Sequence, residues 1–117
     1  MDFPGWIPRE QLYDLFTRAT AFLYPSLFEG FGLAVLEALA AGVPTACSRI
    51  EPMNSIAGDA ALKFDPRDPA AIAEAMHRLV TDGELRQRLA AAGPLRAAQF
   101  SWRTTAQGIL DALRGVC

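Results

Sequence analysis

Residues 24–38, which read YPSLFEGFGLAVLEA, decide the fold and the candidate site of this chain. Their order is typical of the end of a strand, a loop with two glycines, and an almost wholly apolar helix. Gly30 and Gly32 lack a Cβ atom, so the backbone there can adopt unusual φ/ψ values and approach a ligand closely. The helix is expected to start near Gly32, with unpaired N–H groups and the positive end of its dipole directed at the loop. A phosphate or a sugar hydroxyl placed there would meet donors that already point toward it.

Two carboxylates occur in this stretch, Glu29 in the loop and Glu37 in the helix. Glu29 could be solvated, as most loop glutamates are, although the neighbouring glycines favour a role in binding. Glu37 is flanked by Leu36 and Ala38, and a charge on so apolar a helix is costly unless it is paired, hydrogen-bonded or solvated in a cleft. It could face solvent or pair with an arginine, but its place just past the helix start favours a cleft. There its two oxygens could accept two hydrogen bonds from a vicinal diol such as a ribose.

Composition limits the class of protein. The chain has 117 residues, enough for one domain, and 51% of them are hydrophobic, which is ample for a core. A net charge of −2 gives nucleic-acid binding no electrostatic support. Cys47 and Cys117 do not make a disulfide framework, which favours reduced thiols in a cytoplasmic protein. No apolar run reaches the length of a membrane span, and the first residues lack a signal-peptide pattern.

Short apolar strands alternate with amphipathic helices, which predicts an α/β fold with a partial Rossmann-like parallel sheet flanked by helices. Short strands are expected at residues 21–24, 44–48 and 61–64, and the family resemblance given below implies a further strand tail at residues 1–4. The strand at 21–24 is expected to be buried on both faces. Roughly four strands are fewer than a doubly wound domain uses, so residues 1–117 are expected to form a single, truncated domain. Missing strands would leave an open sheet edge through which chains could self-associate.

Periodicity and end signals predict the helices. The helix of the glycine stretch should run to about Ala41 and end at Gly42, and Asp68-Pro69 should start another. Gly93-Pro94 is expected to interrupt the helix that follows, and residues 49–58 to form a polar loop with room for one helical turn. Three helices are also marked by apolar residues at helical spacing along one face. The first follows Pro8, the second follows Asp68-Pro69, and the third follows the cap Ser101. Their apolar residues are, in that order, Leu12, Leu15, Phe16 and Ala19; Ile72, Ala75, Met76, Leu79 and Val80; and Trp102, Ala106, Ile109, Leu110 and Leu113.

Other reactive side chains have ordinary interpretations. His77 lies beside the apolar stripe of its helix and has no partner spaced like a base or a metal ligand, which favours a surface histidine. No group of His, Cys, Asp and Glu residues has the spacing of a metal site. Ser26 and Ser48 show no local signature of a catalytic triad.

Residues 29–37 and the following ALAAGVP (38–44) resemble the signature of GT-B glycosyltransferases, in particular the C-terminal, donor-binding part of the retaining family called group 1 or family 4. Seven residues, GFGLAVL, separate the two glutamates. Four further segments resemble those around the family motif: PGWIP at 4–8, AFLYPS at 21–26, GDAAL at 58–62 and FSW at 100–102. Because nearly the whole chain is covered, the resemblance is far more specific than two glutamates alone.

The resemblance implies a role for each matched residue. Glu29 would be the catalytic residue that orients the donor sugar and helps to stabilise the positive charge developing at its anomeric carbon. Glu37 would bind the ribose diol, and the backbone amides of Gly30, Phe31, Gly32 and Leu33 would bind sugar hydroxyls and the distal phosphate. The implied reaction is transfer of a glycosyl group from a nucleoside-diphosphate sugar to an acceptor, with retention at the anomeric carbon and no metal or other cofactor.

The resemblance also implies parts that this sequence lacks. The family's basic pair for the leaving diphosphate lies upstream of the motif, and the acceptor-binding domain is absent. The chain therefore looks like part of a hexosyltransferase-type enzyme and should be inactive alone, and any membrane contact would be made by the missing domain. PMNS at 52–55 departs from a Pro-Glu pair in many relatives, so no role is assigned there. The alternatives are a non-catalytic nucleotide-sugar-binding or assembly module and a GT-B enzyme such as a nucleotide-sugar epimerase, which resembles this motif less closely.

Overall fold

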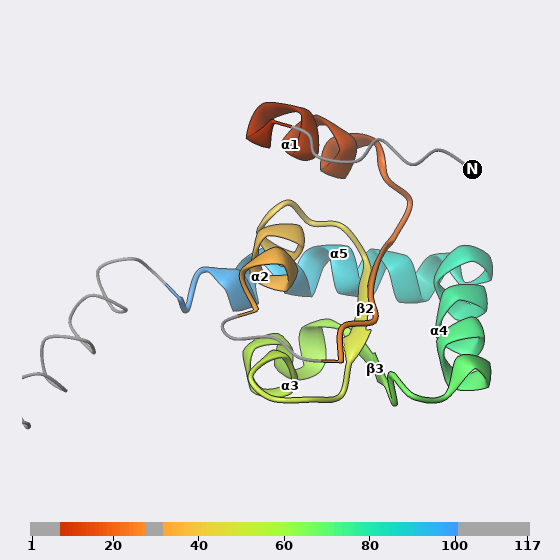
Figure 1. Cartoon of the computed structure of the whole chain (residues 1–117). Helices are drawn as coiled ribbons and strands as arrows, with labels where there is room; N and C mark the ends of the chain where they lie inside the picture. The colour runs from red at the N-terminus through yellow and green to blue at the C-terminus, as the bar shows by residue number, and fades with distance from the viewer. Residues whose placement is uncertain (1–7, 28–31, 101–117) are drawn as a thin grey trace, which may run out of the picture.

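The computed structural model describes residues 8–27 and 32–100, which form a parallel β-sheet with helices on both faces (Figure 1). The described strands are β1 (Phe22–Tyr24), β2 (Thr45–Ser48) and β3 (Leu62–Phe64), adjacent in that order. Both pairings are parallel, with Leu23 beside Ala46 and Cys47 beside Lys63. The expected α/β class with a partial Rossmann-like sheet is therefore confirmed. The strand tail expected at residues 1–4 lies outside the described residues.

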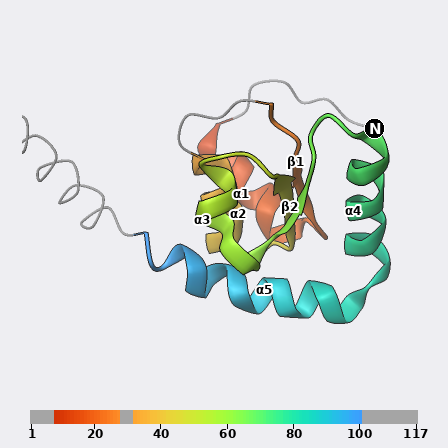
Figure 2. The ribbon, with the colours of Figure 1, turned by 90° about the horizontal axis from the view of Figure 1, so that it is seen from below.

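The helices form two layers around this sheet. They are α1 (Arg9–Arg18), α2 (Leu33–Ala40), α3 (Met53–Ala57), α4 (Pro69–Thr81) and α5 (Gly83–Ala97), with a 3₁₀ turn, η1 (Gly58–Ala60), after α3. Figure 2 shows α4 on one side of the sheet, α2 and α3 on the other, and α5 crossing from the first side to the second. Accordingly, Leu89 of α5 packs with Ala46 and Leu79 in one apolar cluster, while Ala92 packs against the cluster of Leu39 and Met53.

Two expected helix ends are confirmed in detail. Asp68 accepts hydrogen bonds from the backbone N–H groups of Ala70 (3.0 Å) and Ala71 (3.3 Å), and Pro69 is the first residue of α4. Gly42 follows α2 with a φ of 76°, in the left-handed conformation that glycine adopts most easily after a helix.

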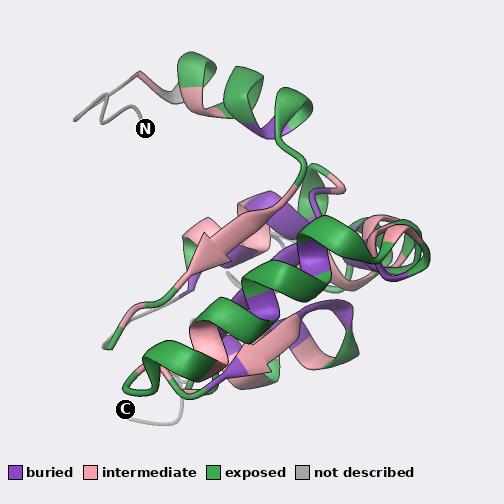
Figure 3. Cartoon of the chain, turned by 90° about the vertical axis from the view of Figure 1, so that its right-hand side faces the viewer, coloured by how far each residue is buried: buried purple, intermediate pink, exposed green. Residues whose placement is uncertain are grey.

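Strand β1 is less buried than the sequence predicts. Its three residues are only half-buried, whereas all four residues of β2 are buried, so the prediction of a strand covered on both faces is wrong for β1 (Figure 3). The reason is position, since β1 forms the edge of the described sheet. Helix α1 covers it mainly through Phe16, whose ring meets that of Phe22 edge-on at 5.3 Å. Most of α1 is exposed, including Leu15 of its expected stripe at 42%.

Helix α5 does not break at Gly93-Pro94, which corrects a second prediction. It runs from Gly83 to Ala97 with Pro94 inside it. Gly93 is buried, and a Cβ atom on it would lie 2.7 Å from the carbonyl oxygen of Leu39 in α2. Glycine therefore serves here as the point of closest approach between two helices. The packing that this contact permits outweighs the hydrogen bond that Pro94 removes from the helix.

The expected apolar stripe of α4 is divided between core and surface. Ala75 and Leu79 are buried against the sheet, but Met76 and Val80 are 49% and 58% exposed.

In the expected polar loop, Met53 and Ala57 of α3 are buried, so the single helical turn contributes to the core. The last predicted helix, from Ser101 onward, lies outside the described residues. No helix within residues 8–27 and 32–100 has the length and apolar character needed to cross a bilayer.

Candidate functional site

Two loops meet beside the carboxyl ends of β1 and β2. The hydroxyl group of Ser48 donates a hydrogen bond to the carbonyl oxygen of Tyr24 at 3.3 Å and so joins the ends of the two strands. The backbone N–H of Arg49 donates to the carbonyl oxygen of Phe64 at 2.7 Å and joins β3 to them. The loop after β1 leads into α2, and the loop after β2 leads into α3. In open parallel sheets this carboxyl edge is where ligands bind.

Gly32 sets the start of α2. It is buried and left-handed, with φ 71° and ψ 26°, and its carbonyl oxygen accepts the N–H of Leu36 at 3.1 Å. A Cβ atom on Gly32 would lie 3.1 Å from Cδ1 of Ile56 and 3.5 Å from Cγ of Met53. The predicted unusual backbone conformation is confirmed. The close approach that it permits on the Cβ side is to α3, because those two side chains fill the space.

The amino end of α2 has the polarity expected of an anion site. Its N-cap residue is Gly32, which has no side chain to cap the helix, and its first turn contains no acidic residue. Glu37 lies four residues after Leu33, so the two residues share a face of the helix. Leu33 is 40% exposed and Glu37 is half-buried, whereas Val35 on the other side is fully buried. Glu37 therefore lies one turn inside the helix, at the boundary between core and surface.

The structure brings only part of the predicted site together. Gly32, Leu33 and Glu37 lie on the first turns of α2. Glu29, Gly30 and Phe31 lie outside the described residues, so their roles stay predictions.

Glu51 is a structural residue at this edge that the sequence analysis did not select. Hydrogen bonds from the Ser55 hydroxyl group, and also from Asn54 at 3.3 Å and the Ser55 backbone N–H, hold the pKa of Glu51 below its ordinary value, although slight desolvation opposes them. Its carboxylate therefore lies beside the first turn of α3, after a cis peptide bond between Glu51 and Pro52. An acidic residue shortly before a short run with helical spacing is the signal that could have identified this contact.

Cys47 and Lys63 lie side by side in the sheet. Burial raises the pKa of the Cys47 thiol to about 11, although the positive charge of Lys63 lowers it slightly. The thiol is free and stays protonated near neutral pH, so Cys47 is an inert core residue. Lys63 also contributes to lowering the pKa of Glu51, which places its charge near the loop after β2.

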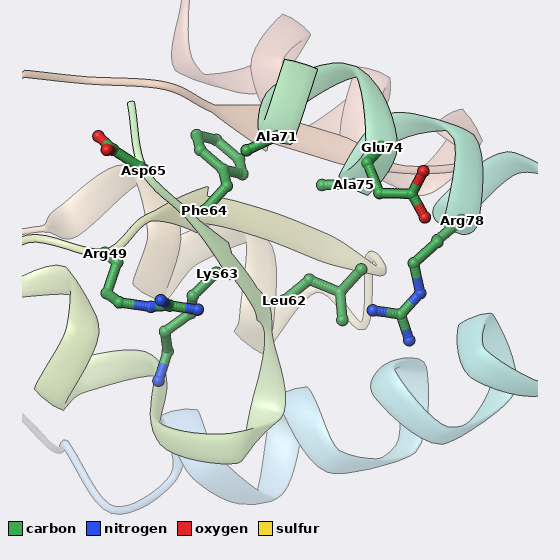
Figure 4. Close-up of a pocket in the computed structure, with 9 residues that line it drawn as sticks. All are labelled: Arg49, Leu62, Lys63, Phe64, Asp65, Ala71, Glu74, Ala75 and Arg78. Carbon is green, nitrogen blue, oxygen red and sulfur yellow. The ribbon is translucent and has the colours of Figure 1, made fainter. Parts of the chain in front are cut away.

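A pocket of about 290 Å³ lies around β3, away from α2. In Figure 4 Arg49 and Lys63 extend on one side of β3, while Glu74, Ala75 and Arg78 come from α4 on the other. The pocket has cations and carboxylates in its wall, and its remaining lining residues are Leu62, Phe64, Asp65 and Ala71. None of the residues predicted for the donor site lines it.

The other candidate side chains have the ordinary roles expected of them. His77 is exposed on α4. Ser48 is buried and donates to a backbone carbonyl. Among residues 8–27 and 32–100, no group of three or more His, Cys, Asp or Glu side chains is arranged to hold a metal ion.

Comparison with known proteins gives one family. A family model described as "Glycosyl transferases group 1" matches residues 1–96. O-antigen chain mannosyltransferase B of Escherichia coli is 38% identical over 110 residues, which are 94% of this chain and 29% of that protein. D-inositol 3-phosphate glycosyltransferase of Frankia alni is 38% identical over 109 residues, or 92% of this chain and 27% of that protein. The chain thus spans less than a third of the length of these relatives.

A solved structure has the same fold. Sucrose-phosphate synthase from Thermosynechococcus elongatus superposes with a TM-score of 0.84 at 29% sequence identity. The similarity covers 98% of this chain and 30% of the other. The same fold therefore occurs in a protein of related sequence.

Proposed function

Because the chain belongs to the group 1 glycosyl transferases, we propose that it supplies part of the donor site of a glycosyltransferase. The reaction is transfer of a glycosyl group, of the hexosyl type, from a nucleoside-diphosphate sugar to an acceptor, with retention at the anomeric carbon. The acceptor is bound by a further domain of the whole enzyme, the donor site requires no metal ion, and the enzyme works in the cytoplasm.

The start of α2 carries this proposal. A left-handed Gly32 at the carboxyl edge of a parallel sheet is the N-cap of a helix, and it provides no side chain to occupy the N–H groups there. Such an end favours a diphosphate through its N–H groups and its dipole. Glu37 follows one turn later on the same face as Leu33. Four residues of helix rise about 6 Å, comparable with the reach from a ribose diol to the phosphates on its 5′ carbon.

Each residue then has a defined task. The backbone N–H groups of Gly32 and Leu33, with those of Gly30 and Phe31, bind the distal phosphate and sugar hydroxyls. Glu37 accepts two hydrogen bonds from the ribose diol, which its half-buried position makes stronger than in bulk water. Glu29 orients the sugar and stabilises positive charge at the anomeric carbon.

The named relatives support the reaction class and leave the sugar open. They include a mannosyltransferase, a D-inositol 3-phosphate glycosyltransferase and a sucrose-phosphate synthase. Because these names differ in sugar and acceptor, the proposal extends to a nucleotide-sugar donor and no further.

The test is calorimetric titration of the chain with UDP, GDP and ADP and with their glucose and mannose conjugates, beside Glu37→Ala. We expect weak binding of one nucleotide series and a loss of at least about tenfold in affinity in the variant. Glu74→Ala, at an exposed glutamate of α4, is the matched control and should bind like the wild type. Equal affinity of Glu37→Ala and the wild type would contradict the role of Glu37. A folded chain that binds none of these nucleotides would contradict the assignment of a donor site to residues 24–38.

A further inference from the structure

Arg96 joins two parts of the fold that are far apart in sequence. It lies in the last turn of α5, and its Nε and Nη2 atoms donate to the carbonyl oxygens of Ile56 (2.8 Å) and Ser55 (2.7 Å). Both acceptors belong to the final turn of α3, where a helix leaves carbonyl groups without internal partners. A cation at this end is also favoured by the helix dipole.

The guanidinium group is itself held in place. Its Nη1 atom donates to Oε1 of Gln99 at 2.6 Å, and its Cζ atom lies 5.1 Å from the centre of the Phe100 ring. Gly58, which follows α3 with a φ of 52°, leaves room for it, since a Cβ atom there would lie 3.3 Å from Nε of Arg96. A planar, forked donor in this setting fixes both the position and the direction of α3.

Side chains of α3 border the proposed donor site. Met53 and Ile56 fill the space next to the absent Cβ of Gly32, at 3.5 Å and 3.1 Å. Any shift of α3 would therefore displace the residue from which α2 starts. A helix of five residues has little stability of its own, so its position depends on such tertiary contacts.

Helix α5 supports both walls of the site. Gly93 contacts α2 at Leu39, and Arg96 holds α3 from one turn further along α5. Residues three apart lie on the same face of a helix, so the two contacts act from one side. The amino end of α2 and the body of α3 are thus set against each other by one rigid element.

We propose that Arg96 is a positioning residue for the donor site, which fixes Gly32 and the start of α2 through α3. Its part in donor binding rests on the function proposed above, while its effect on Gly32 can be measured without a ligand. Arg96 touches no predicted donor-binding residue in the described part of the chain, so its influence passes through the backbone of α3.

The test compares Arg96→Ala and Arg96→Lys with Arg86→Ala in the full chain. Arg86 is a close control, because its Nη1 atom donates from α5 to the carbonyl oxygens of Leu79 (3.0 Å) and Val80 (2.7 Å) at the end of α4, on the other side of the sheet. Hydrogen exchange is measured for residues 36–40, 53–57 and 69–81, and nucleotide affinity by the titration described above.

Arg96→Ala should speed exchange at least about tenfold in residues 36–40, beginning with the Leu36 N–H that donates to the Gly32 carbonyl, and in residues 53–57, and leave 69–81 unchanged. Arg86→Ala should have the reverse pattern. Arg96→Lys, which offers a point charge without the fork, should restore part of the protection and part of the nucleotide affinity. If Arg96→Ala does not fold, the exchange pattern of Arg96→Lys alone tests whether Arg96 positions Gly32.

Unchanged exchange at residues 36–40 in the folded Arg96 variants would overturn the proposal. If the wild type binds no nucleotide, the donor-site function fails, yet the exchange pattern still decides whether Arg96 positions Gly32. If the wild type binds a nucleotide and the Arg96 variants bind it equally well, Arg96 has no role in donor binding.

Discussion

Gly32 is the residue on which the geometry of the candidate site depends most directly. Its positive φ and its contact with α3 are two separate reasons why a side chain is excluded there. The first reason belongs to the backbone and follows from glycine chemistry. The second belongs to packing, because Met53 and Ile56 come from α3, which follows the loop after β2. A single residue thus ties the loop after β1 to the loop after β2.

Substitution of Gly32 should be costly. We expect Gly32→Ala to lower the free energy of unfolding by about 1–3 kcal/mol, since alanine is strained at positive φ and its Cβ would press on Ile56. The measurement is urea denaturation followed by circular dichroism. Gly83→Ala is the control, because a Cβ there would make only an ordinary contact, with Nη2 of Arg86 at 3.6 Å, and its effect should be near zero or favourable. Similar losses in both variants would contradict this account.

Glu51 should give the fold a defined acid dependence. Its pKa is lower in the folded chain than the ordinary value of 4.5, so its contribution to stability is present above that value and is lost as the pH falls through the folded-state pKa. Glu51→Gln should therefore show a smaller fall in the free energy of unfolding between about pH 5 and pH 3. The comparison is urea denaturation across this range, with Glu74→Gln as the control. Parallel curves for Glu51→Gln and the wild type would show that the contact of the Glu51 carboxylate with α3 does not stabilise the fold.

At the level of secondary structure, the helices α2, α3 and α5 set the geometry of the candidate site. Both loops that reach the carboxyl edge of the sheet continue into helices, and α5 supports those helices from behind. The contact at Gly93 brings the backbones of α5 and α2 together more closely than any larger residue would allow. The orientation of α2, and so of its amino end, depends on this contact.

A side chain at position 93 should push the two helices apart. Gly93→Ala would place a Cβ 2.7 Å from the carbonyl oxygen of Leu39, a backbone atom that cannot move aside as a side chain can. We expect a loss of about 1–3 kcal/mol in the free energy of unfolding, measured by thermal or urea denaturation. Pro94→Ala, at the exposed neighbouring residue, should be neutral or stabilising because it restores a helical N–H. A stable Gly93→Ala variant would show that α2 and α5 pack more loosely than described.

These helices also show which features of the fold could be predicted from the sequence and which could not. Local chemistry sufficed for the Asp68-Pro69 helix start, the glycine after α2 and the start of α2, because each depends on one or two neighbouring residues. Gly93-Pro94 was misjudged because the same residues that break an isolated helix can serve a helix contact, which depends on a residue 54 positions away in the chain. The half-burial of β1 and the hydrogen bonds from Arg96 to α3 likewise depend on residues that are far apart in the sequence.

At the scale of the whole molecule, the two edges of the described sheet differ in character. β1 consists of Phe22, Leu23 and Tyr24, all half-buried and uncharged. β3 carries Lys63, and Arg49 and Arg78 lie around it in the pocket of Figure 4. Charged residues on an edge strand discourage the pairing of further strands, so β1 is the edge suited to pairing.

Self-association should accordingly occur through β1. We expect sedimentation equilibrium to show dimers or larger species as the protein concentration rises, with little dependence on salt, because the edge is apolar. Association through the cationic β3 edge would instead grow stronger as salt screens the repulsion. A clean monomer at high concentration would remove the prediction.

The central claim is that a nucleotide binds at the start of α2, and amide chemical shifts test it most directly. The ¹⁵N-labelled chain is titrated with UDP, GDP and ADP while the backbone resonances of the described residues are followed. The account predicts that one nucleotide shifts the amides of residues 32–37, at the start of α2. Shifts centred instead on Arg49, Lys63 and Arg78, the cations of the pocket around β3, would contradict it.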